Sequence, residues 1–147
     1  EDDAMVNFRM SSGTVGRLWT SSVAIGRQHG FDIQVFGEKG GLKWMSEQPN
    51  QLLYSKIGSR TEIIEKGEDN LHEDASRLSR VAIAHPEGFP LAVANIYVDI
   101  AATINGDGRA NLPTAEDGLR SMAAVYAATE SARNEGKWID ARPPMFR

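Results

Sequence analysis

Two short polar segments contain the side chains best suited to binding a small polar molecule. Arg27, Gln28 and His29 follow one another between Gly26 and Gly30. Their guanidinium, amide and imidazole groups together supply hydrogen-bond donors and acceptors, which the hydroxyls of a sugar need once they leave water. A solvated turn between two strands is the other interpretation of this segment, and the residues alone leave both open.

The second segment is His85-Pro86-Glu87-Gly88, which immediately precedes a predicted helix. His85 either contacts a ligand, caps that helix or satisfies a buried carbonyl, and a structural role is the plainer interpretation. His29, His72 and His85 show no metal-ligand spacing, and no chelating cluster accompanies them. We therefore expect no metal site.

Serine and tryptophan provide weaker candidates. Ser21 and Ser22 have no histidine–acid partner in the pattern, which argues against a nucleophilic serine. Trp19 and Trp44 lie in predicted strands. Tryptophan at such positions usually packs in a core or an interface, and stacking on a sugar ring is the alternative.

The bulk composition of the 147-residue chain narrows the classes of partner. A net charge of -4 and scattered lysines and arginines argue against nucleic acid, which requires a concentrated basic face. No apolar run approaches the ~20 residues of a membrane helix, so we expect no membrane association. The lack of cysteine excludes disulfides and fits a reducing, cytoplasmic location. The sequence starts at Glu1-Asp2-Asp3 and moves directly into a strand pattern, which suggests a piece of something longer, with a processed or tag-trimmed whole protein as the alternative.

Six segments have the pattern of β-strands. In residues 4–10, apolar side chains occupy every second position, which is the period of a half-buried strand. Alternation and enrichment in β-branched and aromatic residues predict five more strands, over residues 14–24, 31–35, 42–46, 52–57 and 61–65. The short connections between successive strands favour antiparallel pairing.

The second half of the chain has the pattern of helices. Apolar residues at spacings of three and four predict a helix over residues 89–104, and Asn105-Gly106-Asp107-Gly108 ends it. Thr114 is the predicted N-cap of a last helix, which Asn134-Glu135-Gly136 ends. Lys137-Trp138-Ile139 is then either a short closing strand or a tail packed on the sheet.

Strands followed by helices predict an α+β fold, with an open-faced, mostly antiparallel sheet and helices packed on one face. Between the two halves, residues 67–84 are polar and are predicted to be irregular, with one helical turn near residues 72–78. The sheet face away from the helices mixes polar and apolar side chains, which is typical of an interface. Its residues are Met5, Arg17, Asp32, Gln34, Phe36, Lys43 and Met45.

Three stretches in this chain carry motifs in a fixed order. They are Gly30 to Trp44 with Pro49-Asn50 after it, His85-Pro86-Glu87-Gly88-Phe89 running on to Asn95-Ile96-Tyr97, and Leu112 to Arg120 with Gly136-Lys137-Trp138-Ile139 at the end. In this order and spacing they resemble the C-terminal part of the Gfo/Idh/MocA oxidoreductase family. The resemblance spans nearly the whole chain.

The resemblance implies both what the chain is and what it lacks. Residues 1–147 would be the C-terminal part of a substrate-binding and oligomerisation domain, without the N-terminal Rossmann domain. The chain has no Gly-x-Gly-x-x-Gly to hold a pyrophosphate, and it has neither the Glu-Lys-Pro of the family's catalytic lysine nor its Asp–His pair. We therefore place no catalytic or cofactor-binding residue here, and expect NAD or NADP in the full-length parent but not on this fragment.

The resemblance also implies that residues 27–29 face the substrate pocket, as the corresponding region does in the family. We accordingly expect Arg27, Gln28, His29 and His85 to contact the substrate. The expected function is that of the C-terminal domain of an NAD(P)-dependent oxidoreductase acting on a sugar, inositol or related polyol, which forms a homo-oligomer through the open sheet face. A non-catalytic dimerisation or small-ligand-binding module is the alternative.

Overall fold

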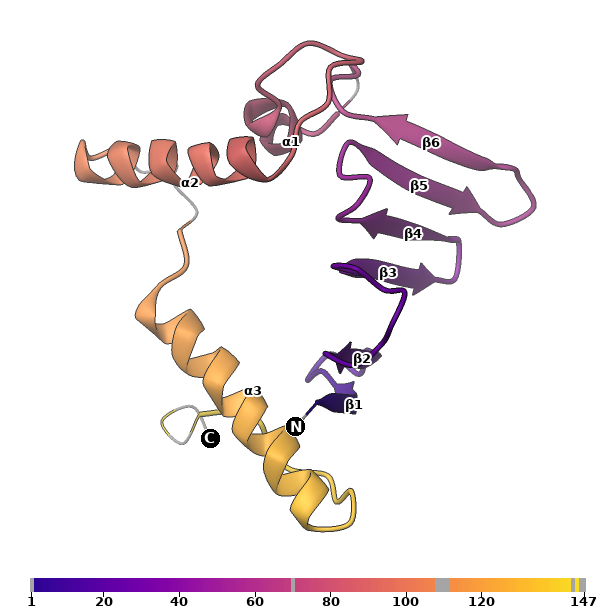
Figure 1. Ribbon diagram of the computed structural model, residues 1–147, viewed down its shortest axis with the longest axis vertical. Helices are drawn as coiled ribbons and strands as arrows, with labels where there is room; N and C mark the ends of the chain where they lie inside the picture. Colours follow the sequence, from indigo (N-terminus) through magenta and orange to yellow (C-terminus); the bar gives the residue numbers. More distant parts are fainter. Residues whose placement is uncertain (1, 70, 108–111, 144, 146–147) are drawn as a thin grey trace. The chain divides into compact units, whose positions relative to one another are not determined.

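The computed structural model describes residues 2–69, 71–107, 112–143 and 145. The chain divides into two compact units (Figure 1). Glu1–Ala24 and Asn111–Arg147 form the first unit, and Ile25–Ala110 forms the second. Two segments far apart in the sequence thus build one unit, while a continuous segment builds the other.

The first unit contains an antiparallel hairpin of strands β1 (Asp3–Arg9) and β2 (Val15–Ser21). The predicted turn between them is confirmed, with Gly13 at a φ of 90°. Phe8 lies opposite Gly16, and a Cβ at Gly16 would come within 2.1 Å of Phe8 Cζ. The Phe8 ring therefore covers the glycine, and a larger residue there would have to displace the ring.

Helix α3 (Ala115–Arg133) belongs to the same unit and begins at the predicted N-cap. Thr114 Oγ1 accepts a hydrogen bond from the Asp117 N–H at 3.3 Å, and the Thr114 N–H donates to Asp117 Oδ2 at 2.9 Å, which forms a capping box. The bonds from the Thr114 backbone and hydroxyl, with the nearby Arg120 charge, lower the pKa of Asp117. The helix ends as predicted, with Gly136 at a φ of 79°.

The segment after α3 contains no strand between residues 137 and 143. The Arg9 guanidinium instead lies 5.5 Å from the centroid of the Trp138 ring, a cation–π contact with the end of β1. The closing strand considered for Lys137-Trp138-Ile139 is therefore wrong. The alternative, a tail packed on the strands, agrees with this contact.

The second unit is built on a four-stranded antiparallel sheet. Its strands are β3 (Asp32–Gly37), β4 (Gly40–Met45), β5 (Gln51–Lys56) and β6 (Thr61–Glu65), paired in sequence order. All six predicted strands are thus present, and both the α+β class and the antiparallel pairing are confirmed. The strands are hydrogen-bonded as two sheets, one of β1 and β2 and the other of β3 to β6.

The two faces of this sheet differ in character, because residues directly opposite each other on paired strands share a face. One face, here called the apolar face, carries Ile33, Val35, Leu42, Trp44, Leu52, Tyr54 and Ile64. The other, here called the mixed face, carries Asp32, Gln34, Phe36, Lys43, Met45, Leu53 and Ile63. The predicted mixture of polar and apolar side chains is therefore present on one face of the four-stranded sheet.

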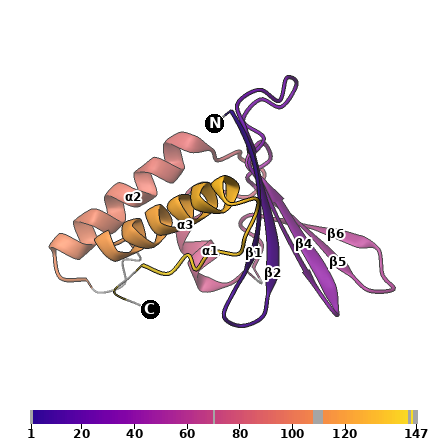
Figure 2. The same cartoon turned by 90° about the horizontal axis from the view of Figure 1, so that it is seen from below.

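Helices α1 (Glu73–Leu78) and α2 (Phe89–Ile104) complete the second unit. Both have the predicted positions, although Gly108 of the predicted stop after α2 lies outside the described residues. An ion pair of 2.7 Å between Arg77 Nη1 and Asp99 Oδ1 joins the two helices. Within this unit, α1 and α2 lie on the same side of the sheet (Figure 2). No helix in the described part of the chain is long and apolar enough to cross a membrane.

Each unit, taken by itself, leaves large apolar side chains partly exposed. No apolar side chain of the described residues is fully buried, and Met5 and Phe36 are 79% and 81% exposed. Exposed apolar surface of this extent is typical of a face that contacts further protein, because covering it removes apolar side chains from water.

Candidate functional site

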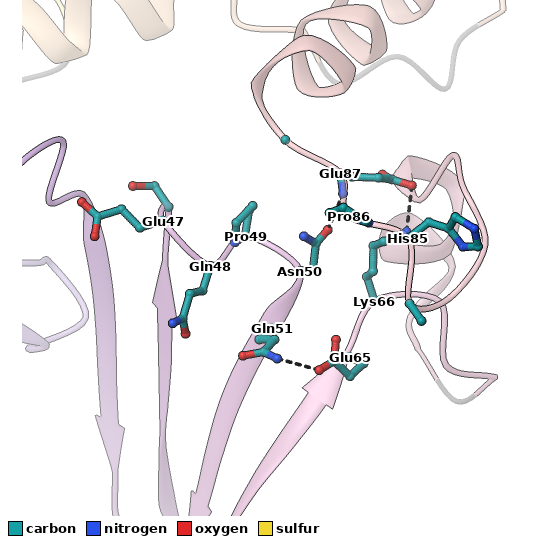
Figure 3. Close-up of a pocket in the computed structure, with 13 residues that line it drawn as sticks. Glu47, Gln48, Pro49, Asn50, Gln51, Glu65, Lys66, His85, Pro86 and Glu87 are labelled. Atoms are coloured by element: carbon teal, nitrogen blue, oxygen red, sulfur yellow. Dashed lines mark hydrogen bonds and ion pairs between the residues drawn. The ribbon is translucent and has the colours of Figure 1, made fainter.

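One hollow of about 610 Å³ lies in the second unit, at the end of the sheet where β5 begins and β6 ends (Figure 3). The turn between β4 and β5 forms one wall, and the loop before α2 forms the other. The lining residues are Ser46, Glu47, Gln48, Pro49, Asn50, Gln51, Glu65, Lys66, Ala84, His85, Pro86, Glu87 and Gly88. Most of these residues have polar side chains, although apolar atoms form more of the exposed lining than polar atoms do.

Lys66 follows the last residue of β6 and has an almost buried side chain, 11% exposed. Its Nζ donates to Val81 O at 2.9 Å, to Ala82 O at 3.2 Å and to Glu87 Oε1 at 3.0 Å. An ammonium group has three N–H donors, and these three acceptors use all of them. Lys66 is therefore a structural cation in this conformation, with no N–H left for a substrate.

Glu87 provides the opposite charge, and its side chain is 12% exposed. Besides Lys66, its Oε1 accepts the backbone N–H groups of Arg80 at 2.6 Å and Val81 at 2.5 Å. Burial acts to raise the pKa of Glu87, but the hydrogen bonds from Val81, Lys66 and Arg80 and the Lys66 charge outweigh it, so this pKa lies below its ordinary value. The carboxylate is consequently ionised at neutral pH.

Asn50 links this ion pair to the sheet. Its Oδ1 accepts the Glu87 N–H at 3.0 Å, while its backbone oxygen accepts the Lys66 N–H at 2.9 Å. The second bond extends the β5–β6 ladder by one residue, and alternation along the strands places both residues on the apolar face. We call these three residues the Asn50–Lys66–Glu87 cluster; it ties the start of β5, the end of β6 and the loop before α2 together (Figure 3).

His85 lines the hollow, but its ring is exposed and points away from Asn50 and Gln51 (Figure 3). Its Nδ1 lies 3.2 Å from Ile83 O. The N-cap of α2 is Gly88, which has no side-chain capping bond, so the considered capping role of His85 is wrong. The contact with Ile83 is a local one within the loop.

Arg27, Gln28 and His29 lie in an exposed loop bounded by Gly26 and Gly30, whose φ values are 93° and 62°. None of the three lines the hollow. The Gly30 N–H donates to Glu47 Oε1 at 3.2 Å, which brings this loop to the side of the hollow formed by the β4–β5 turn. The structure therefore places His85 at the hollow and the Arg27–His29 loop beside it, without joining all four residues in one pocket.

The pattern of the sequence assigned no role to Asn50, Lys66 or Glu87. Glu87 is separated from Lys66 by 21 positions and from Asn50 by 37, so no local spacing connects them. The only sequence features that pointed to Glu87 and Asn50 were their positions in the His-Pro-Glu-Gly motif and in the Pro-Asn pair. In the part of the chain that the structure describes, no group of three or more His, Cys, Asp or Glu is arranged to hold a metal ion.

Comparison with known proteins places this fold in a family. Residues 1–140 match the model described as the C-terminal alpha/beta domain of the oxidoreductase family, Gfo/Idh/MocA. The chain therefore belongs to the Gfo/Idh/MocA oxidoreductase family.

Individual relatives agree with this assignment. The chain is 33% identical to an inositol dehydrogenase homolog from Azotobacter vinelandii solved with NADH and myo-inositol, with a TM-score of 0.88, over 95% of this chain and 39% of that one. It is 32% identical to an oxidoreductase from Pseudomonas syringae, with a TM-score of 0.90, over 97% and 41% of the two chains. It is also 28% identical to the uncharacterised oxidoreductase YfiI of Bacillus subtilis, over 95% of this chain and 38% of that protein. The chain thus spans about two fifths of the length of these relatives.

Proposed function

We propose that this chain is the C-terminal domain of an NAD(P)-dependent oxidoreductase whose substrate is a sugar, inositol or related polyol. The observation that carries the proposal is the 33% identity, over 95% of the chain, to an inositol dehydrogenase homolog solved with NADH and myo-inositol. The match to the family's C-terminal domain over residues 1–140 supports the same conclusion.

In such an enzyme a nicotinamide takes a hydride from the alcohol carbon while a base takes the hydroxyl proton. Both groups would belong to the part of the parent outside this chain. The role proposed here for the chain is to form a wall of the substrate pocket. Arg27, Gln28, His29 and His85 would donate and accept hydrogen bonds to substrate hydroxyls, which supports orientation rather than chemistry.

The second proposed role is assembly of a homo-oligomer through the mixed face of the four-stranded sheet. This face combines the exposed Phe36 with charges of both signs, Asp32 and Lys43. A two-fold interface brings the same patch of each copy together, so a patch with both charges can pair with itself. The exposed apolar area favours such a contact over bare solvent.

The experiment is a dehydrogenase assay of the full-length protein with a panel of polyols and sugars, followed by NAD(P)H absorbance. We expect turnover with at least one polyol. Alanine at Arg27, His29 or His85 should raise its KM by about tenfold if one hydrogen bond to the substrate is lost. A full-length protein that binds NAD(P)H but turns over none of the panel would contradict the proposal. In that case a non-catalytic binding or dimerisation module would be the better interpretation.

A further inference from the structure

The loop from Arg80 to Glu87 is closed by its own last side chain. Glu87 Oε1 accepts the N–H groups of Arg80 and Val81, the first two residues of the loop. Helix α1 ends at Leu78 and helix α2 begins at Phe89, so this segment has no regular structure of its own. Its conformation therefore depends strongly on the carboxylate.

Lys66 enters this closed loop from the sheet. Its ammonium group bonds the carbonyls of Val81 and Ala82 as well as Glu87. With side chains only 11% and 12% exposed, the two charges are largely withdrawn from water and each compensates the other. The loop is therefore folded around the ammonium group of Lys66, a residue that directly follows a strand of the sheet.

The arranged loop is also one wall of the hollow. Ala84 to Gly88 line it from the loop side, opposite the β4–β5 turn. Ala84 has a φ of 66°, a left-handed conformation that a residue with a Cβ adopts only where the surroundings impose it. The bond between Glu87 N–H and Asn50 Oδ1 fixes the distance of this wall from the sheet.

From these contacts we propose that Lys66 and Glu87 are positioning residues for binding of the polyhydroxylated substrate. They contact no substrate themselves; they hold in place the wall formed by residues 84–88, which lines the hollow. The inference rests on the proposed function, because it assigns the hollow to the alcohol substrate. The inference predicts an effect on binding of the substrate but not of the cofactor, because the wall is assigned to the substrate and no described residue of this chain is assigned to the cofactor.

The test uses the full-length enzyme and the variants Glu87→Gln, Lys66→Met and Lys66→Arg. Glu87→Gln keeps an oxygen acceptor for the Arg80 and Val81 N–H groups but removes the charge opposite Lys66. Lys66→Arg keeps the positive charge and tests rescue. The matched control is Glu116→Gln on α3, which removes the same charge from an exposed pair with Arg120, the two side chains being 50% and 57% exposed.

We expect Glu87→Gln and Lys66→Met to raise KM for the polyol by about tenfold, with kcat and the KM for NAD(P)H within about twofold of wild type. Lys66→Arg should recover part of this loss, and Glu116→Gln should change neither KM. Amide hydrogen exchange of residues 80–87 should accelerate in the first two variants only, because the loop loses its anchor.

Three results overturn the inference. Unchanged polyol KM in Glu87→Gln and Lys66→Met shows that the loop does not position the substrate. Equal rises in both KM values with a lower melting temperature show a merely structural role. A wild-type enzyme without activity on any polyol overturns the proposed function as well, which distinguishes that failure from the other two.

Discussion

Replacement of Gly40 by alanine tests how closely β4 and β5 approach each other. A Cβ at Gly40 would lie 2.5 Å from the backbone oxygen of Ser55 and 3.3 Å from the Cα of Lys56, both on β5. Ordinary contact begins at 3.4 Å, so the added atom is roughly 1 Å too close to the oxygen. The obstacle is backbone, which cannot rotate away as a side chain can.

The expected cost is therefore that of overpacking, about 2 kcal/mol of unfolding free energy, because β5 must move away or the strand must bend. Urea denaturation followed by tryptophan fluorescence measures it, since Trp44 lies on the same strand as Gly40. The midpoint should fall without a change in the slope, which reports the surface exposed on unfolding.

The same substitution at Gly118 is the matched control. Gly118 lies inside α3, and a Cβ there would meet no atom within 4 Å. Alanine should stabilise the helix by about 0.5–1 kcal/mol, because glycine loses more backbone freedom on folding. A Gly40→Ala midpoint at or above that of wild type would refute the reasoning, whatever the control does.

Three further predictions concern other parts of the chain. The pKa of Glu87 is lower in the folded state than its ordinary value of 4.5, so the ionised carboxylate stabilises the fold at pH values above 4.5. This stabilisation is lost as the pH falls through the lower folded-state pKa. The stability of Glu87→Gln against acid unfolding should therefore depend less on pH below 4.5 than that of wild type. Thr114→Ala removes an N-cap side chain and should cost about 1 kcal/mol in thermal or urea unfolding, whereas an unchanged stability would mean that the capping box contributes nothing. Phe36→Lys on the mixed face should shift the full-length protein toward smaller species in analytical ultracentrifugation if the proposed oligomer uses that face, and an unchanged assembly would exclude it.

Local patterns predicted the elements of this fold well. The apolar stripe of α2 gave its bounds, Phe89–Ile104, because a helix repeats every few residues and the stripe is interrupted sharply at both ends. Thr114 was recognisable as an N-cap because its side chain acts on a residue only three positions away. The glycine-bounded turn between β3 and β4 is a local signal of the same kind.

Interactions between distant residues were not predictable in this way. The strand patterns predicted six strands but not their division into two sheets, because alternation along a strand does not specify which strands pair. The Asn50–Lys66–Glu87 cluster joins three elements across as many as 37 positions, and a lysine at the end of a strand looks like any solvated lysine. For the same reason the sequence could not show that Arg27 lies beside the hollow while His85 lines it.

The saturated ammonium of Lys66 has a practical consequence for chemical labelling. Amine acylation needs an accessible nitrogen, and this one is surrounded by three oxygens, the carbonyls of Val81 and Ala82 and the Glu87 carboxylate. Lysine-reactive reagents should modify the exposed lysines first and reach Lys66 only when the loop before α2 opens. The rate at which Lys66 is modified would then report the rate of that opening in the native protein.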